Sequence, residues 1–231
     1  MLFRQLFDRE TCTYTYLIGD LVTGSAALVD PVLENVERDL QVLQELGLHL
    51  QYSLETHVHA DHITGGGMLR QRTGCQGVVP AGASVDCADR SLADGETLWL
   101  GEITIEAIAT PGHTDSHLAY LVGGDRVLTG DALFIRGCGR TDFQDGDAGT
   151  LYDVVTGRLF ALPNETLVYP GHDYRGRTVS TIGEEKHFNP RFAGRDRADF
   201  ITLMENLNLP NPQKMMEAVP ANLGCGELRA A

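Results

Sequence analysis

The sequence predicts a layered α/β fold, and three observations lead to this expectation. Short runs of β-forming residues alternate with longer amphipathic stretches, turns rich in glycine and proline separate them, and helical stretches occur in both halves of the chain. Helices in both halves should cover both faces of the β core. With 231 residues, of which 42% are hydrophobic, the chain can bury a large core without added crosslinks.

The first half of the chain contains strand signals around one helix. Short β-type runs occupy residues 13–18, 26–29 and 52–55, and turn residues follow them. Between the second and third runs, hydrophobic residues recur at steps of three and four over 34–46. This spacing predicts a helix that ends at Gly47.

The second half alternates strands and helices in the same way. Strands are expected at residues 103–109, 117–122, 126–128 and 166–169, and helices at 151–160, after a capping box at 181–184, and at 196–207. Trp99 is expected in the core. The stretch from about 210 to 231 has no clear pattern and is expected to be a short irregular tail of a single domain spanning 1–231.

Composition and charge narrow the classes of function. The net charge of −14 argues against nucleic acid and anionic membranes, because such partners need a basic face. Neither a secretory signal nor an apolar run long enough to span a membrane is recognised, which favours a cytoplasmic protein. Five cysteines are scattered without a CxxC pair, so we expect reduced thiols; they are Cys12, Cys75, Cys87, Cys138 and Cys225.

The strongest chemical signal is the run Thr-His-Val-His-Ala-Asp-His, directly after the strand expected at 52–55. It places His57, His59, Asp61 and His62 within a few residues of one another. Side chains two residues apart in an extended segment project from the same side, and imidazole and carboxylate are ligands of zinc and iron. The sequence therefore predicts a metal site here.

Three further candidates follow other predicted strands. His113 stands in Thr-Pro-Gly-His-Thr, Asp131 in Thr-Gly-Asp and His172 in Tyr-Pro-Gly-His-Asp. A glycine precedes each of them closely, which permits tight turns and close backbone approach. Strand exits of an α/β sheet converge on one edge, so we expect these side chains to share a cleft with the histidine run.

These motifs and their order resemble the metallo-β-lactamase superfamily over essentially the whole chain. The resemblance implies the metallo-β-lactamase fold, an αβ/βα sandwich of two mixed β-sheets flanked by helices with a metal cleft at one edge. It says little about the reaction, because members include lactamases, thioesterases, nucleases and oxygenases.

Finer features resemble the persulfide dioxygenases, the sulfur dioxygenases of the glyoxalase II-like branch. These are Ile-Arg-Gly-Cys-Gly-Arg-Thr-Asp-Phe at 135–143, Gly-His-Asp-Tyr at 171–174, Asn-Pro-Arg at 189–191 and Val-Pro-Ala-Asn-Leu-Gly-Cys-Gly at 219–226. The resemblance implies oxidation of glutathione persulfide with O2 and water to sulfite and glutathione, in sulfide and persulfide detoxification. The alternative is a dizinc hydroxyacylglutathione hydrolase (glyoxalase II). That family continues the Gly-Cys-Gly core with two aromatic residues and has a longer C-terminal region.

Ligand counting alone predicts a site for two metal ions, because all seven groups of a two-metal hydrolase are present. The resemblance implies one non-haem Fe(II) per chain, held by His57, His113 and Asp131. Two histidines and one carboxylate leave coordination positions open for oxygen and substrate. By the same resemblance, the groups that orient ligands and waters are His59, Asp61, His62 and His172.

The substrate that the resemblance implies is anionic, so the acidic chain would need local cations to bind it. Arg140 and Arg191 are the candidate carboxylate clamps, and the Tyr174 hydroxyl is expected to reach the substrate or an iron-bound ligand. Asp142 is expected to support this segment by hydrogen bonding. Cys138 is either a redox thiol or a small buried side chain. The expected partners are glutathione persulfide and O2, without nucleic acid or membrane, and a homodimer is the default oligomer.

Overall fold

The computed structural model describes residues 1–210 and 214–226, and the chain divides into two compact units. The first unit contains Met1–Leu92, Leu98–Thr104 and Asn211–Ala231, and the second contains Ala93–Thr97 and Ile105–Pro210. The expectation of one domain over 1–231 stays a prediction. In the part of the chain that the structure describes, no helix has the length and apolar character needed to cross a membrane.

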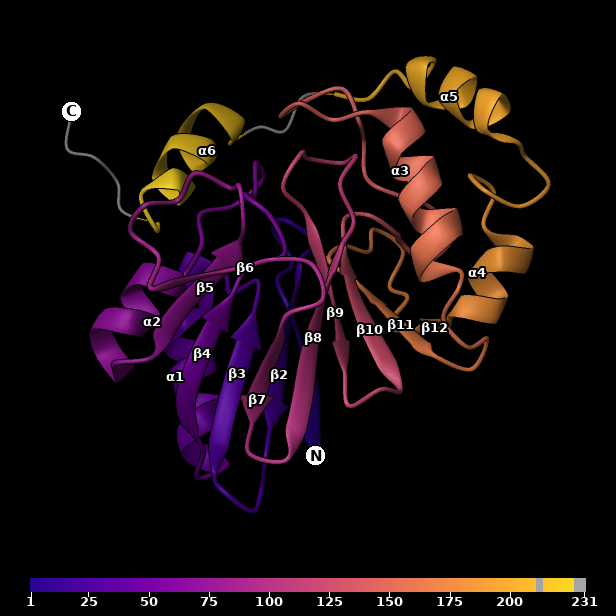
Figure 1. Ribbon diagram of the computed structural model, residues 1–231. Coiled ribbons are helices and arrows are strands. Elements are labelled where there is room, and N and C mark those ends of the chain that lie inside the picture. Colours follow the sequence, from indigo (N-terminus) through magenta and orange to yellow (C-terminus); the bar gives the residue numbers. More distant parts are fainter. Residues whose placement is uncertain (211–213, 227–231) are drawn as a thin grey trace. The chain divides into compact units, whose positions relative to one another are not determined.

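A six-stranded mixed sheet forms the centre of the first unit (Figure 1). Its strands, in order across the sheet, are β1 (Leu2–Phe7), β2 (Tyr14–Gly19), β3 (Ser25–Val29), β4 (His49–Leu54), β5 (Gln76–Pro80) and β6 (Arg90–Leu92). Strands β1 to β3 pair antiparallel, and β3 to β6 pair parallel. All residues of β2 and β3 are buried, as expected for strands covered on both faces.

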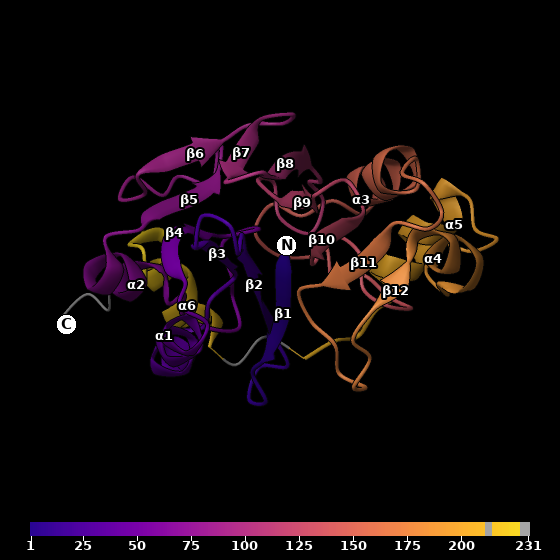
Figure 2. The ribbon, with the colours of Figure 1, turned by 90° about the horizontal axis from the view of Figure 1, so that it is seen from below.

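Helices of the first unit cover this sheet. They are the short 3₁₀ turn η1 (Leu33–Asn35), α1 (Val36–Glu45), α2 (Gly66–Thr73) and α6 (Met215–Leu223). Seen from below in Figure 2, α1 and α2 lie on the same side of the strands, and Val36, Leu43 and Leu69 pack there on Leu17 and Leu28. Helix α6 lies where an irregular tail was expected, so that expectation was wrong for residues 215–223; residues 211–213 and 227–231 lie outside the described residues.

The second sheet is also mixed and contains six strands. Its order is β12 (Ser180–Thr181), β11 (Leu167–Pro170), β10 (Arg126–Gly130), β9 (Leu118–Val122), β8 (Ile103–Ala109) and β7 (Thr97–Leu100), and the boundary between the units falls within β7 and β8. Strands β10 and β11 pair in parallel, whereas β8, β9 and β10 pair antiparallel. The parallel pair brings two strand exits to the same edge of the sheet.

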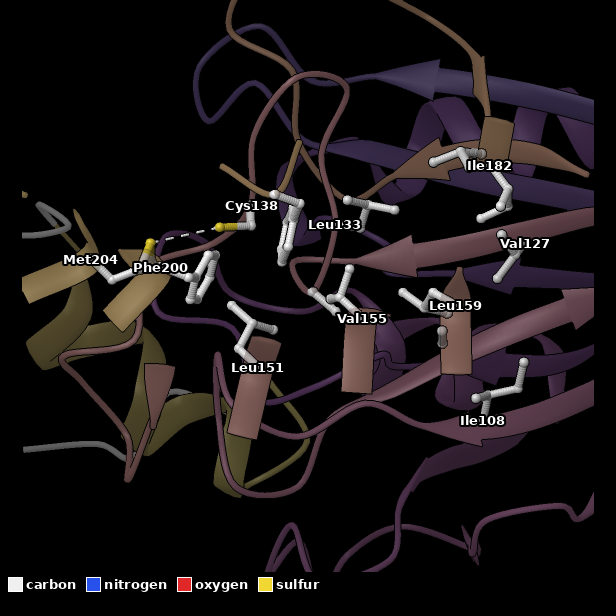
Figure 3. Packing of buried hydrophobic residues seen from close by; sticks show 14 residues of the cluster. Ile108, Val127, Leu133, Cys138, Leu151, Val155, Leu159, Ile182, Phe200 and Met204 are labelled. Atoms are coloured by element: carbon white, nitrogen blue, oxygen red, sulfur yellow. Dashed lines mark hydrogen bonds between the residues drawn. The ribbon is translucent and has the colours of Figure 1, made fainter. Parts of the chain in front are cut away.

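The second unit carries three helices, α3 (Ala148–Val154), α4 (Ile182–Phe188) and α5 (Arg197–Glu205), and a π-helical turn, η2 (Val155–Leu159), continues α3. The predicted cap of α4 is confirmed, because the Thr181 side chain accepts a hydrogen bond from the backbone N–H of Glu184. Figure 3 shows how Leu151 and Val155 pack with Phe200 in the core of this unit.

Cys138 lies in this core and not at a reactive surface. Its Sγ atom lies 3.8 Å from the Sδ atom of Met204 (Figure 3), and burial raises the pKa of the thiol to about 12. A thiol of this kind remains protonated near neutral pH. Of the two interpretations left open by the sequence, the packing role therefore fits the structure.

Two expectations about single residues were wrong. Trp99 is 61% exposed, because in β7 it alternates with Leu98 and Leu100, which take the buried face. Cys87 and Cys225 form a disulfide instead of remaining reduced. Their separation of 138 residues along the chain hid this pairing, but the fold brings their Cα atoms to 6.1 Å.

Candidate metal centre

The histidine loop, which we define as residues 56–62, follows β4 in the middle of the first sheet. Strand β4 has parallel neighbours on both sides, so the loop leaves the carboxyl edge of the parallel strands, where α/β sheets bind ligands. His57, His59 and His62 are buried, and Asp61 is partly exposed. The histidine imidazoles are thus withdrawn from bulk water, and the protein fixes their orientation.

Asp30 and Thr56 determine which nitrogen of His57 can coordinate a metal. The Asp30 carboxylate accepts hydrogen bonds from the Thr56 backbone N–H at 2.7 Å and from its hydroxyl at 2.9 Å. Because the hydroxyl proton goes to Asp30, the Thr56 oxygen accepts from Nδ1 of His57, 2.9 Å away. The neutral ring then carries its lone pair on Nε2, as in metal sites whose ligands are oriented by outer hydrogen bonds.

His59 faces carboxylates on both of its ring nitrogens. Its Nε2 lies 3.1 Å from Asp30 and 3.6 Å from Glu55, and its Nδ1 lies 3.9 Å from Asp61. Burial alone would lower the pKa of His59, but the charges of Asp30, Asp61 and Glu55 outweigh it and raise the pKa to about 9. Three carboxylates around one imidazole fit the orienting role expected for His59.

Asp61 and His62 complete the loop. The Nδ1 atom of His62 lies 2.9 Å from Oδ2 of Asp61, and the Thr13 hydroxyl donates to the same oxygen at 3.3 Å. One ligand atom each from His59, Asp61 and His62 lies within 4.8 Å of the others. These three residues therefore form one polar cluster within the first unit, and the ring of His57 lies beside that of His59 with centroids 4.1 Å apart.

The three remaining candidate metal ligands lie together in the second unit. His113 follows β8, Asp131 follows β10 and His172 follows β11. Oδ1 of Asp131 lies 2.7 Å from Nδ1 of His172, and Oδ2 lies 3.5 Å from Nε2 of His113. Nδ1 of His113 lies 2.7 Å from the carbonyl oxygen of Arg140, so it carries the proton. Within this unit, the predicted convergence of strand exits is observed.

This geometry fits a metal ion. With Nδ1 donating to Arg140, Nε2 of His113 faces Oδ2 of Asp131, and 3.5 Å is too long for an ordinary hydrogen bond. The two atoms stand side by side, so that one cation can contact both. Imidazole and carboxylate are also the donor types that suit iron and zinc.

Sequence reasoning missed His117. The backbone N–H of Asp131 donates to Nε2 of His117 at 3.1 Å, and Nδ1 of His117 lies 2.8 Å from the Thr110 hydroxyl oxygen. His117 is fully buried and thus fixes the backbone of a candidate ligand. Its spacing from the other motifs gave no signal, because the contact depends on the pairing of β9 with β10.

Comparison with known proteins identifies the family. The model of the metallo-beta-lactamase superfamily matches residues 11–172. The chain is 49% identical to the mitochondrial persulfide dioxygenase ETHE1 of Mus musculus and 48% identical to that of Homo sapiens, over 98% of this chain and 89% of each relative. The crystal structure of ETHE1 from Myxococcus xanthus matches with a TM-score of 0.96 and 57% identity, covering 98% of this chain and 100% of that chain.

The chain belongs to the persulfide dioxygenase family of the metallo-beta-lactamase superfamily. This confirms the predicted resemblance and the predicted fold class, the metallo-beta-lactamase fold with two mixed sheets flanked by helices. The match over almost the whole chain supports an oxidoreductase over the hydroxyacylglutathione hydrolase that the sequence left as the alternative.

In this persulfide dioxygenase family member, Arg140 already binds a carboxylate of its own chain. Its Nε and Nη2 atoms donate to the two oxygens of Asp142 at 2.6 and 2.7 Å, and Nη1 donates to the carbonyl of Pro210 at 2.8 Å. The guanidinium also lies 4.2 Å from the ring centroid of Phe143. Asp142 therefore holds Arg140, whose carbonyl in turn holds His113.

Tyr174 and Arg191 have the exposure that substrate contacts need. Tyr174 is 69% exposed, and its ring stacks on His172 with centroids 6.0 Å apart. Arg191 is half-buried, and its backbone N–H donates to Oδ1 of Asn189 at 3.0 Å. Their roles at the substrate stay predictions.

Proposed function

We propose that this chain oxidises glutathione persulfide with one O2 and one water to sulfite and glutathione. Both atoms of O2 go to the outer sulfur, and the water releases it from the inner sulfur, so the atoms balance. The observation that carries the proposal is the facing pair of Nε2 of His113 and Oδ2 of Asp131, in a chain related over nearly its full length to persulfide dioxygenases.

In this proposal, one Fe(II) is held by His57 and His113 through their Nε2 atoms and by Asp131 through Oδ2. The partners of the other atoms support this assignment: Thr56 holds Nδ1 of His57, the Arg140 carbonyl holds Nδ1 of His113, and His172 holds Oδ1 of Asp131. Two histidines and a carboxylate leave open positions on iron. Bound Fe(II) would supply electrons to O2 and a site of attachment for the persulfide sulfur.

The chain's own residues orient the ligands and the substrate. His59, Asp61, His62 and His172 hold ligands and waters in place, and Asp142 supports the Arg140 segment. Arg191 is proposed to bind a glutathione carboxylate, and Tyr174 to donate its hydroxyl proton to the substrate. Arg140 is proposed as the second carboxylate contact, which requires that it share its guanidinium between Asp142 and the substrate.

The setting of the reaction is also part of the proposal. Removal of sulfide-derived persulfides is the proposed role, in the cytoplasm, with a homodimer as the assembly and without nucleic acid or membrane partners. The net charge of −14 supports the exclusion of nucleic acid. The mouse and human relatives are named as mitochondrial proteins.

Oxygen uptake tests the function directly. Protein reconstituted anaerobically with Fe(II) is given glutathione persulfide, and O2 consumption, sulfite and metal content are measured together. We expect one iron per chain and one sulfite per O2. His113→Ala and Asp131→Ala should lose iron and uptake, whereas His187→Ala, a change at an exposed histidine, should retain both. Iron-loaded protein without O2 uptake, or hydrolysis of S-lactoylglutathione with two zinc ions bound, would contradict the proposal.

A further inference from the structure

Helix α6 packs directly on the segment that follows the histidine loop. Its buried residues Ala218 and Ala221 contact Ile63, and Leu33 of η1 completes this small cluster. At the start of the helix, Lys214 forms ion pairs with Glu10 and Glu34. The helix is therefore fixed to the first unit by apolar and ionic contacts, although it lies far along the chain from the loop.

Asn222, in the last turn of α6, makes the closest connection to the loop. Its side-chain Nδ2 donates to the carbonyl oxygens of His59 and His62, each at 2.9 Å. Its Oδ1 accepts from the backbone N–H of Thr64 at 2.8 Å. Asn222 is 5% exposed. Its side-chain amide donates two hydrogen bonds and accepts one, all with backbone groups of residues 59–64.

These three bonds constrain the backbone of the second half of the histidine loop and the residue pair that follows it. A peptide carbonyl that is held in place fixes the plane of its peptide group and therefore the direction of the neighbouring side chains. His59 and His62 enclose Asp61, so bonds to both carbonyls set the path of the backbone through the second half of the loop. If the Nδ2 donor of Asn222 were removed, the carbonyls of His59 and His62 would stay buried without these hydrogen bonds.

A disulfide ties the end of α6 to the same unit. Cys225 lies in the turn after the helix, and Cys87 lies between β5 and β6. The backbone around Cys225 also touches α2, because a Cβ atom on Gly67 would lie 2.2 Å from the Cys225 carbonyl oxygen. The disulfide therefore anchors the helix end within three residues of Asn222.

We propose that Asn222 is a positioning residue for the histidine loop, and that the Cys87–Cys225 disulfide makes the metal affinity of the loop depend on thiol redox state. This rests on the proposed function in that the loop contributes to the metal site. Two glutathione molecules open the disulfide: one thiolate forms a mixed disulfide and releases one cysteine, and the second displaces the other cysteine. Glutathione disulfide is the oxidised product, and both cysteines leave as thiols.

The first test removes the donors and keeps the shape. Asn222→Asp retains Oδ1 for Thr64 but places a carboxylate oxygen against two carbonyls. We expect its affinity for Fe(II), measured by anaerobic chelator competition on the full chain, to fall at least tenfold, which is the range for lost orienting contacts. The visible spectrum of the Co(II) form should shift too, which loss of stability alone would not cause. Asn206→Asp, at an exposed helix end, is the matched control.

Affinity within twofold of wild type together with an unchanged Co(II) spectrum would overturn the role of Asn222. Wild-type protein that binds neither Fe(II) nor Co(II) would overturn the proposed function and, with it, this inference. Metal binding by the wild type that Asn222→Asp does not change would overturn this inference alone. If Asn222→Asp does not fold, Asn222→Ser and the wild-type protein reduced with glutathione provide the same comparison. For Asn222→Ser and for the reduced wild-type protein, weaker metal binding with retained folding supports the proposal, and unchanged metal binding contradicts it.

A double-mutant cycle tests the link to the disulfide. Cys87→Ser should weaken metal binding severalfold in the wild-type background and have no further effect with Asn222→Asp, because the disulfide acts through the asparagine. Cys12→Ser, which removes a thiol outside the disulfide, is the control. Additive losses, or a Cys87→Ser variant with wild-type affinity, would show that the disulfide does not act on the loop.

Discussion

The Nδ1 atom of His172 lies 2.7 Å from the Oδ1 atom of Asp131. The contact follows from sheet topology, because β10 and β11 pair in parallel and each delivers one of these residues at its end. One carboxylate oxygen is thereby held by a histidine, and the other faces His113. A single aspartate thus links two strand exits, and its orientation depends on its neighbour.

Replacement of His172 should weaken metal binding and leave the fold intact. His172→Leu removes the group that orients Asp131, and we expect Fe(II) affinity to fall about tenfold to hundredfold in chelator competition. His172→Asn, whose amide nitrogen can stand close to the position of Nδ1, should recover part of the loss. His187→Leu, at an exposed position, serves as the control. Wild-type affinity in His172→Leu would rule out this dependence.

Gly171 leaves room for the same carboxylate. A Cβ atom at this position would lie 2.6 Å from Oδ1 of Asp131 and 3.1 Å from the carbonyl carbon of Gly130. Gly171→Ala should therefore displace Asp131 and reduce both metal content and O2 uptake by about tenfold or more. Gly157→Ala is the matched control, since a Cβ atom there has no neighbouring atom within 4 Å. Equal metal content in the two variants would contradict this explanation.

His117 should matter for stability as well as for the site. His117→Phe removes the acceptor of the buried Asp131 N–H, and leaving such a donor unsatisfied costs about 1–3 kcal/mol. We expect urea denaturation to show a loss of this size. His117→Gln, which keeps an acceptor, should lose less. The interpretation fails if the phenylalanine variant is as stable as wild type.

The stability of the first unit should depend on pH through Asp39. Burial raises the pKa of this carboxyl to about 6, although Arg38 acts in the opposite direction. The folded chain therefore retains a proton that the unfolded chain releases, and the Asp39 contribution to stability is lost as pH rises from about 4 to about 6. Asp39→Asn removes this loss, so it should stabilise the protein at pH 8 by roughly 1–3 kcal/mol and leave stability unchanged at pH 4.

Urea denaturation of Asp39→Asn at pH 4, 6 and 8 measures this difference. Glu205→Gln, a similar change at an exposed helix position, provides the control. A constant difference between Asp39→Asn and wild type over the whole range would show that Asp39 does not titrate as described.

Local patterns predicted the histidine loop and the strand exits well. The loop lies within one short segment after β4, and His113, Asp131 and His172 each follow a strand whose periodicity is visible in the sequence. The loop and the strand ends depend on residues that are neighbours along the chain, so the sequence alone predicts them. The exposed position of Trp99 was also readable, since the alternation of Leu98 and Leu100 already assigns the buried face.

Contacts between residues far apart along the chain could not be predicted from the sequence. The hydrogen bond from Asn222 to the His62 carbonyl spans 160 residues, and the disulfide spans 138. Neither has a periodicity or a spacing that identifies its partner, because both arise when a distant helix packs on the sheet. The same holds for His117, whose role depends on how β9 and β10 are paired.

The packing of α6 on the first unit has a consequence for synthesis. A ribosome releases the chain from its N-terminal end, so β1 to β6 can assemble long before α6 leaves the exit tunnel. During that interval the carbonyls of His59 and His62 lack the amide of Asn222, and Cys87 has no partner. The nascent chain therefore contains the complete histidine loop before the residue that donates to two of its carbonyls has been made.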